Sequence, residues 1–391
     1  MPLPHFKVII VGASIEGITL AYCLHRAGIN YLILERRNER VPPREDLLIV
    51  MPNGARIWDQ LGLLDRITDF IVPIEKAYMT LPDTGSHEIG FPRVLRERFG
   101  YSPAFMSKRK VLEMLYTHLP RNDKLKFDKN VVRIETGPNC MRVVTWDGYD
   151  YGGDLVVGAD GAHSKVRGEM ARLSKLEGLT MDVNNYMTVE YVRITGVSTQ
   201  DLDYPALTRG TMLTSNCAGQ NIACLTAPHT GQDTSCSIED AAELANLLHG
   251  RLRGRRTKPS TEEINILLGT FTQRRIRRLK PIYREAKRAI RHMTFCGPWN
   301  RLIARYYLTR NEQVIAEWFS KDVAGGVSVK FLPLPERSEL AWSDIQLEQH
   351  TYWGGVGTTR IQCGSWAALH TVVVIESPRY IGRRKPALCP L

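Results

Sequence analysis

The sequence predicts an α/β fold of the Rossmann type, with a reduced mixed sheet interlocked with it and a helical C-terminal part. Three observations predict the Rossmann unit. The β-branched run Lys7–Val11 is followed by helical periodicity over residues 15–27, and a second apolar run covers residues 31–34. Residues 155–157 are apolar throughout, which is typical of a buried parallel strand. Parallel strands joined by a helix need a right-handed crossover, so we expect helices on both faces of the sheet.

Further helices and strands are expected before residue 170. Apolar residues at helical spacing predict helices over residues 53–63 and 108–119. Runs of alternating or continuous apolar residues predict strands over residues 124–127, 131–135, 141–146 and 149–157. The pair Asp147-Gly148 suits a hairpin turn between the last two strands.

The later part of the chain divides less clearly. We expect a strand over residues 187–194, a helix from Ser237 to about Leu248 and a long basic helix from Thr261 to about residue 294. No periodicity is visible from about residue 338 onward. These patterns divide the chain into four parts, over residues 1–170, 171–225, 226–338 and 339–391.

The formal charge of +11 has two possible explanations. Hydrophobic residues make up 43% and charged residues 24% of the chain, which is ordinary for a folded soluble protein. The excess of cations is concentrated in residues 251–258 and 274–280, and no nucleic-acid-binding motif accompanies it. We interpret these cations as a solvated helix face and do not expect a nucleic-acid partner. Attraction to cofactor phosphates or to a membrane surface is the alternative.

Cysteine spacing and hydropathy indicate the cellular compartment in which the protein is expected. The eight cysteines show no CxxC spacing, so neither a metal site nor a disulfide framework is expected. The first seven residues run directly into a strand and leave no room for a signal peptide. No run of 18 apolar residues occurs, so no membrane-spanning helix is expected. A cytoplasmic protein, with peripheral membrane association left open, is the expectation.

Residues 12–17 carry the first chemical signal, because they read Gly-Ala-Ser-Ile-Glu-Gly between a strand and a helix. Gly12 permits the tight turn, and Gly17 lets the helix approach the sheet. The helix N-terminus then directs N–H groups and positive dipole at a pyrophosphate. Glu35, at the end of the second strand, can accept hydrogen bonds from both hydroxyls of an adenosine ribose. Ser14 replaces the middle glycine of this motif and makes the backbone approach more crowded.

Residues 158–161, Gly-Ala-Asp-Gly, carry the second signal. They end the buried strand of residues 155–157 and lead into a helix with Ser164 near its N-cap. By itself, Asp160 would more often be a turn residue than a ligand. Because it accompanies the first motif, we interpret Asp160 and Gly161 as part of a dinucleotide site.

With these two motifs the chain resembles the group A flavoprotein monooxygenases, the aromatic-hydroxylase class. More narrowly, residues 6–34, 52–63 and 331–337 resemble fungal paxilline-type and meroterpenoid epoxidases. The resemblance covers residues 5–170, resumes at about residues 226–248 and includes residues 331–338. It implies FAD as the cofactor and NAD(P)H as the electron donor.

The resemblance also implies a role for each part of the chain. Residues 1–170 would form the FAD-binding domain, residues 171–225 a shortened substrate-covering segment, and residues 226–338 the flavin loop and C-terminal helices. Within the first domain, Gly12, Ser14, Gly17 and Glu35 would hold the AMP half of FAD. Asp160 would serve its central part.

The third motif of the family is altered. Residues 226–233 resemble the family's flavin loop, which implies that Gly231 and Gln232 line the flavin ring. Upstream, Gly219-Gln220 stands where the family has Gly-Asp; Gln220 can still bond a ribityl hydroxyl but brings no charge. Asp233 replaces the last loop glycine and would put a carboxylate beside the ring, where a reduced anionic flavin would be disfavoured.

Three further features depart from the family pattern. Lys108 aligns with an arginine of the family, and Arg109 follows one step later, so one of the two is expected near the cofactor. Residues 44–48 replace a small glycine-containing segment near the isoalloxazine. Only 58 residues separate Asp160 from Gly219, which is short for a substrate-covering sheet.

The leading hypothesis is an NAD(P)H- and FAD-dependent monooxygenase of fungal secondary metabolism. It would epoxidise or hydroxylate an apolar prenylated or polycyclic intermediate of meroterpenoid or indole-diterpene type. The changes at Gln220 and Asp233 keep open a non-redox binding protein or cyclase with the same fold, and a flavin oxidase or dehydrogenase is a third hypothesis. No catalytic residue is assigned. His229 is the best acid–base candidate, with a structural role as the alternative.

Overall fold

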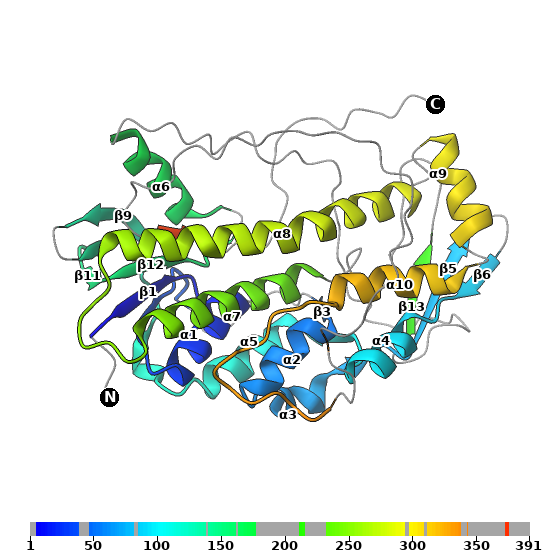
Figure 1. Ribbon diagram of the computed structural model, residues 1–391, viewed down its shortest axis with the longest axis horizontal. Coiled ribbons are helices and arrows are strands. Elements are labelled where there is room, and N and C mark those ends of the chain that lie inside the picture. The colour runs from blue at the N-terminus through cyan, green and yellow to red at the C-terminus, as the bar shows by residue number, and fades with distance from the viewer. Residues whose placement is uncertain are drawn as a thin grey trace.

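The computed structural model describes residues 5–38, 47–81, 85–137, 140–161, 163–176, 211–215, 232–293, 297–308, 311–337, 342 and 372–374. Within them the chain forms a five-stranded sheet, three small sheets and a broad layer of helices (Figure 1). The α/β fold expected from the sequence is confirmed. The strand expected over residues 187–194 lies outside the described residues.

The five-stranded sheet is parallel and has the order β14-β12-β1-β2-β8. Its strands are β1 (Lys7–Val11), β2 (Asn30–Leu34), β8 (Leu125–Lys126), β12 (Leu155–Gly158) and β14 (Val372–Val374). The central strands β1 and β12 are almost fully buried, as their unbroken apolar runs require. Strand β14 comes from the segment in which the sequence showed no periodicity.

Three helices form the layer beside this sheet: α1 (Ile15–Arg26), α7 (Gln232–Leu252) and α8 (Thr261–Met293). Figure 1 shows α7 lying between α1 and the long helix α8. Helix α7 begins at Gln232, five residues before the start expected at Ser237. Its polar first turn is buried against α2 and β3, and tertiary packing of this kind is not visible in the hydrophobic periodicity.

The strand expected over residues 149–157 is two strands, so this expectation was wrong. Strand β11 (Asp150–Gly153) pairs antiparallel with β10, whereas β12 joins the parallel sheet. The break falls at Asp154, whose N–H donates to the carbonyl of Lys7 and whose carboxylate accepts from the Lys7 N–H. Gly153 beside it allows close packing, because a Cβ atom there would lie 2.7 Å from a side-chain carbon of Ile9.

The small sheets have the orders β11-β10-β9, β13-β5-β6 and β3-β7-β4. Their other strands are β3 (Leu47–Val50), β4 (Val72–Pro73), β5 (Lys76–Leu81), β6 (Gly85–Glu88), β7 (Ala104–Ser107), β9 (Val131–Thr136), β10 (Met141–Thr145) and β13 (Thr211–Ser215). Strand β13 pairs parallel with β5, so the segment after residue 170 shares a sheet with strands inserted in the first domain.

The remaining helices surround these sheets. They are α2 (Pro52–Gln60), α3 (Leu64–Ile67), α4 (Phe91–Phe99), α5 (Lys108–Thr117), α6 (Lys165–Leu176), α9 (Pro298–Leu302) and α10 (Glu312–Val323). Short 3-10 segments cover Thr68–Phe70 and Asn122–Lys124, and a π-helical turn covers Ile303–Leu308. None of the helices in the described ranges is long and apolar enough to cross a bilayer.

Candidate cofactor site

The two glycine motifs meet at the carboxyl ends of β1 and β12. Gly12 has φ +104°, and a Cβ atom there would lie 2.3 Å from the carbonyl oxygen of Ala159. A Cβ atom at Gly17 would lie 2.1 Å from the carbonyl oxygen of Gly12. Both positions therefore require glycine for backbone packing, and this packing places the start of α1 against the Gly158–Gly161 turn.

Ser14 is the N-cap of α1. Its Oγ accepts a hydrogen bond from the Gly17 N–H at 3.4 Å and donates to the carbonyl of Ala159 at 3.1 Å. The Ser14 side chain thus links the two motifs, and it accepts a hydrogen bond from one of the N–H groups at the start of the helix. The N–H groups of Ile15 and Glu16 belong to the first turn and have no acceptor within their own helix, so they are the ones available to an anion.

Glu35 is buried at the end of β2 and is already bonded by protein groups. One carboxylate oxygen accepts from the Ala13 N–H at 2.7 Å, and the other accepts from the N–H and Nε of Arg37 at 3.0 and 2.9 Å. Burial alone would raise the pKa of Glu35, but the bonds from Arg37 and Ala13 hold that pKa below its usual range. A carboxylate has about four acceptor positions, so the oxygen facing Ala13 retains room for a ribose hydroxyl.

Tyr116 and Arg37 also hold the glycine turn in place, and neither residue was predicted from the sequence. The Tyr116 hydroxyl donates to the carbonyl of Ala13 and accepts from a guanidinium nitrogen of Arg37 at 3.3 Å. Helix α5 therefore fixes the turn from the side opposite to β12. Only a contact between distant segments reveals this role.

Asp160 has one satisfied and one unsatisfied oxygen. Its Oδ2 accepts from the N–H groups of Lys165 and Val166 at 2.7 and 3.2 Å and so caps α6. Its Oδ1 is buried and has no hydrogen-bond partner among the described residues. Gly161 follows with φ +79°, a left-handed conformation that suits glycine. Oδ1 of Asp160 can therefore accept a hydrogen bond from a donor that is not among the described residues.

The start of α5 lies beside the start of β3. Strand β7 pairs with β3 in antiparallel register, with Ser107 opposite Leu47. Lys108 follows directly and is partly buried, whereas Arg109 is exposed. The structure therefore brings Lys108 to the segment expected near the isoalloxazine. Of that segment, residues 44–46 lie outside the described residues.

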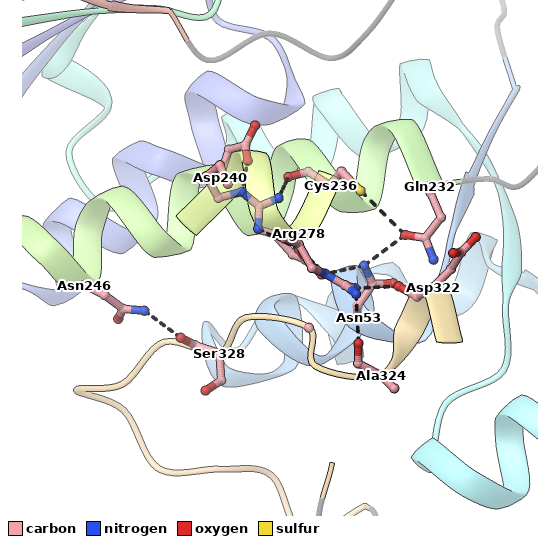
Figure 2. A network of polar contacts seen from close by, with 12 residues as sticks. Asn53, Gln232, Cys236, Asp240, Asn246, Arg278, Asp322, Ala324 and Ser328 are labelled. Atoms are coloured by element: carbon pink, nitrogen blue, oxygen red, sulfur yellow. Dashed lines mark hydrogen bonds and ion pairs between the residues drawn. The ribbon is translucent and has the colours of Figure 1, made fainter. Parts of the chain in front are cut away.

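Gln232 forms the first residue of α7 and is 2% exposed. Its Oε1 accepts from Nδ2 of Asn53 on α2 at 3.0 Å, and the Cys236 thiol is 3.8 Å away (Figure 2). Its Nε2 is buried without a partner among the described residues. Because Asn53 binds Oε1 of Gln232, the orientation of the amide is fixed. Nε2 can then donate a hydrogen bond to a group outside the described residues.

A buried ionic cluster lies behind Asn53. Glu239, fully buried on α7, accepts from Nδ2 of Asn53 at 2.7 Å, from Arg275 at 2.8 Å and from Arg278 at 3.1 and 3.3 Å. Arg278 also donates to the carbonyls of Asp322 and Ala324 at the C-terminal end of α10 (Figure 2). Burial by itself would raise the pKa of Glu239, but the two arginines lower it. The cluster therefore joins α2, α7, α8 and α10 by charge-assisted bonds.

Asp240 connects this cluster to the glycine turn. It pairs with Nε of Arg275, and Glu16 at the start of α1 is close enough to act on its charge. Burial raises the pKa of Asp240 to about 6, although Arg275 opposes the rise. Gln232 lies eight residues before Asp240 on the same helix, about 12 Å at 1.5 Å per residue. Helix α7 thus spans from the glycine turn to the buried amide of Gln232.

The structure gathers most of the residues expected at the site from the sequence. It places Gly12, Ser14, Gly17, Glu35, Asp160 and Gly161 around the ends of β1, β2 and β12, and Lys108 and Gln232 lie on separate elements. Asp233 is partly exposed in the first turn of α7, where a helix dipole favours a carboxylate. The remaining expected residues, Gly219, Gln220, His229 and Gly231, lie outside the described residues.

These residues fit a dinucleotide cofactor. Buried polar atoms normally have partners, and the unpaired ones among the described residues include Oδ1 of Asp160, Nε2 of Gln232 and Oδ1 of Asn53 beside it. A group with both donors and acceptors would suit the first two. The glycine turn and the start of α1 provide the approach for phosphates. No cluster of metal-binding side chains occurs in the part of the chain that the structure describes.

Comparison with known proteins agrees with this arrangement. The FAD binding domain family matches residues 5–193. The FAD-dependent monooxygenase nodM of Hypoxylon pulicicidum is 32% identical over 429 residues, covering 88% of this chain and 92% of nodM. The FAD-dependent monooxygenase cdmI of Talaromyces verruculosus is also 32% identical, covering 86% and 89% of the two chains.

A solved structure shows the same fold. HpxO of Klebsiella pneumoniae, complexed with FAD and uric acid, superimposes with a TM-score of 0.58 at 17% identity. The superposition covers 81% of this chain and 97% of HpxO. The resemblance noted from the motifs is therefore confirmed, and the chain belongs to the family of FAD-dependent monooxygenases, which bind FAD and use NAD(P)H and O2.

Proposed function

We propose that the protein inserts one oxygen atom into an apolar prenylated or polycyclic intermediate of fungal secondary metabolism, by epoxidation or hydroxylation. The substrate is of meroterpenoid or indole-diterpene type. Membership of a family with fungal monooxygenases such as nodM and cdmI supports the reaction class. A cytoplasmic or peripherally membrane-associated location belongs to the same proposal.

The observation that supports cofactor binding in this proposal is the pair of buried, unsatisfied atoms at Asp160 and Gln232. Leaving a buried polar atom without a partner costs about 1–3 kcal/mol, and a bound cofactor group would remove that cost. Bound FAD supplies the oxygen-transfer chemistry. In this arrangement the Asp160 carboxylate accepts from a cofactor hydroxyl, and the Gln232 amide donates to a cofactor acceptor.

Asn53 is the positioning residue for Gln232 in this proposal. Its amide nitrogen binds both the Gln232 oxygen and Glu239, so it fixes which end of the glutamine amide points outward. Glu239, itself held by Arg278, fixes Asn53 in turn. Lys108 or Arg109, and Gly231 next to Gln232, are proposed as further cofactor contacts.

The test begins with the visible spectrum of the purified protein before and after FAD is added. Wild type is expected to take up FAD, to consume NADPH with O2, and to add one oxygen to a prenylated polycyclic substrate, detected as a mass increase of one oxygen atom. A protein that binds no FAD would support the non-redox alternative that the altered residues Gln220 and Asp233 suggest. Bound FAD with hydrogen peroxide as the sole product would support an oxidase.

Two asparagine variants test the positioning role. Asn53→Ala is expected to raise the Kd for FAD about 10-fold, because one cofactor hydrogen bond of about 1.4 kcal/mol loses its orientation. Asn246→Ala is the matched control. Asn246 is a buried asparagine on α7, the helix of Gln232, and lies fourteen residues beyond it. It bonds Ser328 and Lys330. Equal FAD affinities in the two variants would refute the role of Asn53.

A further inference from the structure

The outer face of α8 presents a continuous row of cations. The helix has 33 residues, and between Gln273 and Met293 arginine and lysine outnumber acidic residues nine to one. Its inner face, with Phe271, Arg275 and Ile282, is buried. Residues three and four apart share a helix face, so the outward cations form one line. We call them the basic face of α8: Arg277, Lys280, Arg284, Lys287, Arg288 and Arg291.

Within the basic face, Arg288 pairs with Glu285 at 2.7 Å, and three other cations lie outside the internal ionic network. Arg275 and Arg278 point inward to Glu239, and Arg274 pairs with Glu243. By contrast, Arg277, Lys280 and Arg284 have no acidic partner in the part of the chain that the structure describes. Like charges at these spacings destabilise a helix by a few tenths of a kcal/mol per pair. These three cations therefore form an unfavourable charge arrangement that a negatively charged partner would relieve.

An exposed apolar patch lies where α8 ends. Trp299 is 77% exposed, and Leu302 and Tyr306 are about half exposed. They are spaced three and four residues apart, so they share a face of α9 and the following π-helical turn, while Ala304 and Leu308 are buried on the other side. Figure 1 shows α9 directly beyond the C-terminal end of α8. We call Trp299, Leu302 and Tyr306 the α9 patch.

The order of these groups distinguishes between possible partners. From Arg277 to Arg291 the line extends about 21 Å, which fits an array of phosphate groups better than one compact anion. A single-stranded nucleic acid would need aromatic side chains interleaved with the cations for base stacking. Tyr283, the tyrosine within the basic stretch, is partly buried. The exposed aromatic residues, Trp299 and Tyr306, are collected at one end, beside a leucine. Tryptophan, tyrosine and leucine next to cations are typical of residues that enter the headgroup region of a bilayer.

We propose that the basic face of α8 and the α9 patch together bind the surface of an anionic phospholipid bilayer. The cations contact lipid phosphates and carboxylates, and Trp299, Leu302 and Tyr306 enter the interface. Contact is peripheral. The inference rests on charge and exposure alone and does not depend on the proposed oxygenation.

Flotation with lipid vesicles tests this surface. The FAD-loaded full-length protein is mixed with vesicles of phosphatidylcholine alone or with 30% phosphatidylserine, at 50 and 150 mM NaCl. We expect binding to the anionic vesicles only, and weaker binding at the higher salt concentration. The triple variant Arg277→Gln, Lys280→Gln, Arg284→Gln should lower the partition coefficient about 100-fold, since each cation contributes about a fivefold factor at the membrane surface.

Matched variants distinguish vesicle binding by this surface from a general effect of the protein's net charge. Arg26→Gln, Arg93→Gln and Arg96→Gln remove three exposed cations elsewhere and should leave vesicle binding within about threefold of wild type. Trp299→Ser should remove most of the binding that persists at 150 mM NaCl. No binding to the anionic vesicles, or an equal loss in the two triple variants, would overturn the proposal. It would also be overturned if an RNA oligonucleotide bound the basic face while vesicles did not.

Discussion

Replacing Glu239 by glutamine should destabilise the protein more than the same change one turn later in the helix. Both oxygens of Glu239 accept two hydrogen bonds each, so an amide must turn its NH2 group toward two donors. The change also leaves Arg275 and Arg278 without their shared counterion. Removing one partner from a buried ion pair costs about 3–5 kcal/mol.

This cost can be read from thermal unfolding. For 391 residues at about 2.1 cal/mol/K per residue, the unfolding entropy is about 0.8 kcal/mol/K. Glu239→Gln is therefore expected to lower the thermal midpoint by about 4–6 °C, measured by circular dichroism at pH 7.5. In the control Glu243→Gln, the carboxylate is bound by Arg274, which is half exposed, so the loss should stay near 1 °C. Equal shifts in the two variants would refute the assignment of Glu239 as the centre of the cluster.

Two further changes test the glycine turn and a buried carboxylate. Gly12→Ala should abolish FAD binding, because the alanine Cβ would lie 2.3 Å from the carbonyl oxygen of Ala159. The purified variant should therefore lack flavin absorbance. Flavin binding at wild-type affinity would contradict this prediction. Burial raises the pKa of Asp322 from 3.8 to about 7, against the opposing effect of Arg278. The stability linked to Asp322 is therefore full below pH 4 and is lost as the pH rises through 7. Asp322→Asn should flatten the fall in thermal midpoint between about pH 4 and 7, and parallel pH profiles for variant and wild type would contradict the assignment.

Local chemistry in the sequence was enough to predict the core of the fold. The parallel strands around Lys7–Val11 and residues 155–157 are apolar because both faces of the sheet are covered. The glycines at 12 and 17 and the acidic Glu35 have fixed spacing within one βαβ unit, so their proximity follows from the order of residues. The family resemblance read from these motifs was confirmed by the relatives.

Only the tertiary structure decided how the two ends of the site are joined. Asn53, Glu239, Arg275 and Arg278 come from three helices far apart in sequence, and no periodicity marks a buried charge that is neutralised by a distant segment. The start of α7 at Gln232 and the break at Asp154 were likewise set by packing against other elements. The sequence by itself determined the glycine turn and its helix, because these depend on backbone conformation and local spacing. The fixed orientation of the Gln232 amide depended on contacts between helices, which exist only once the chain has folded.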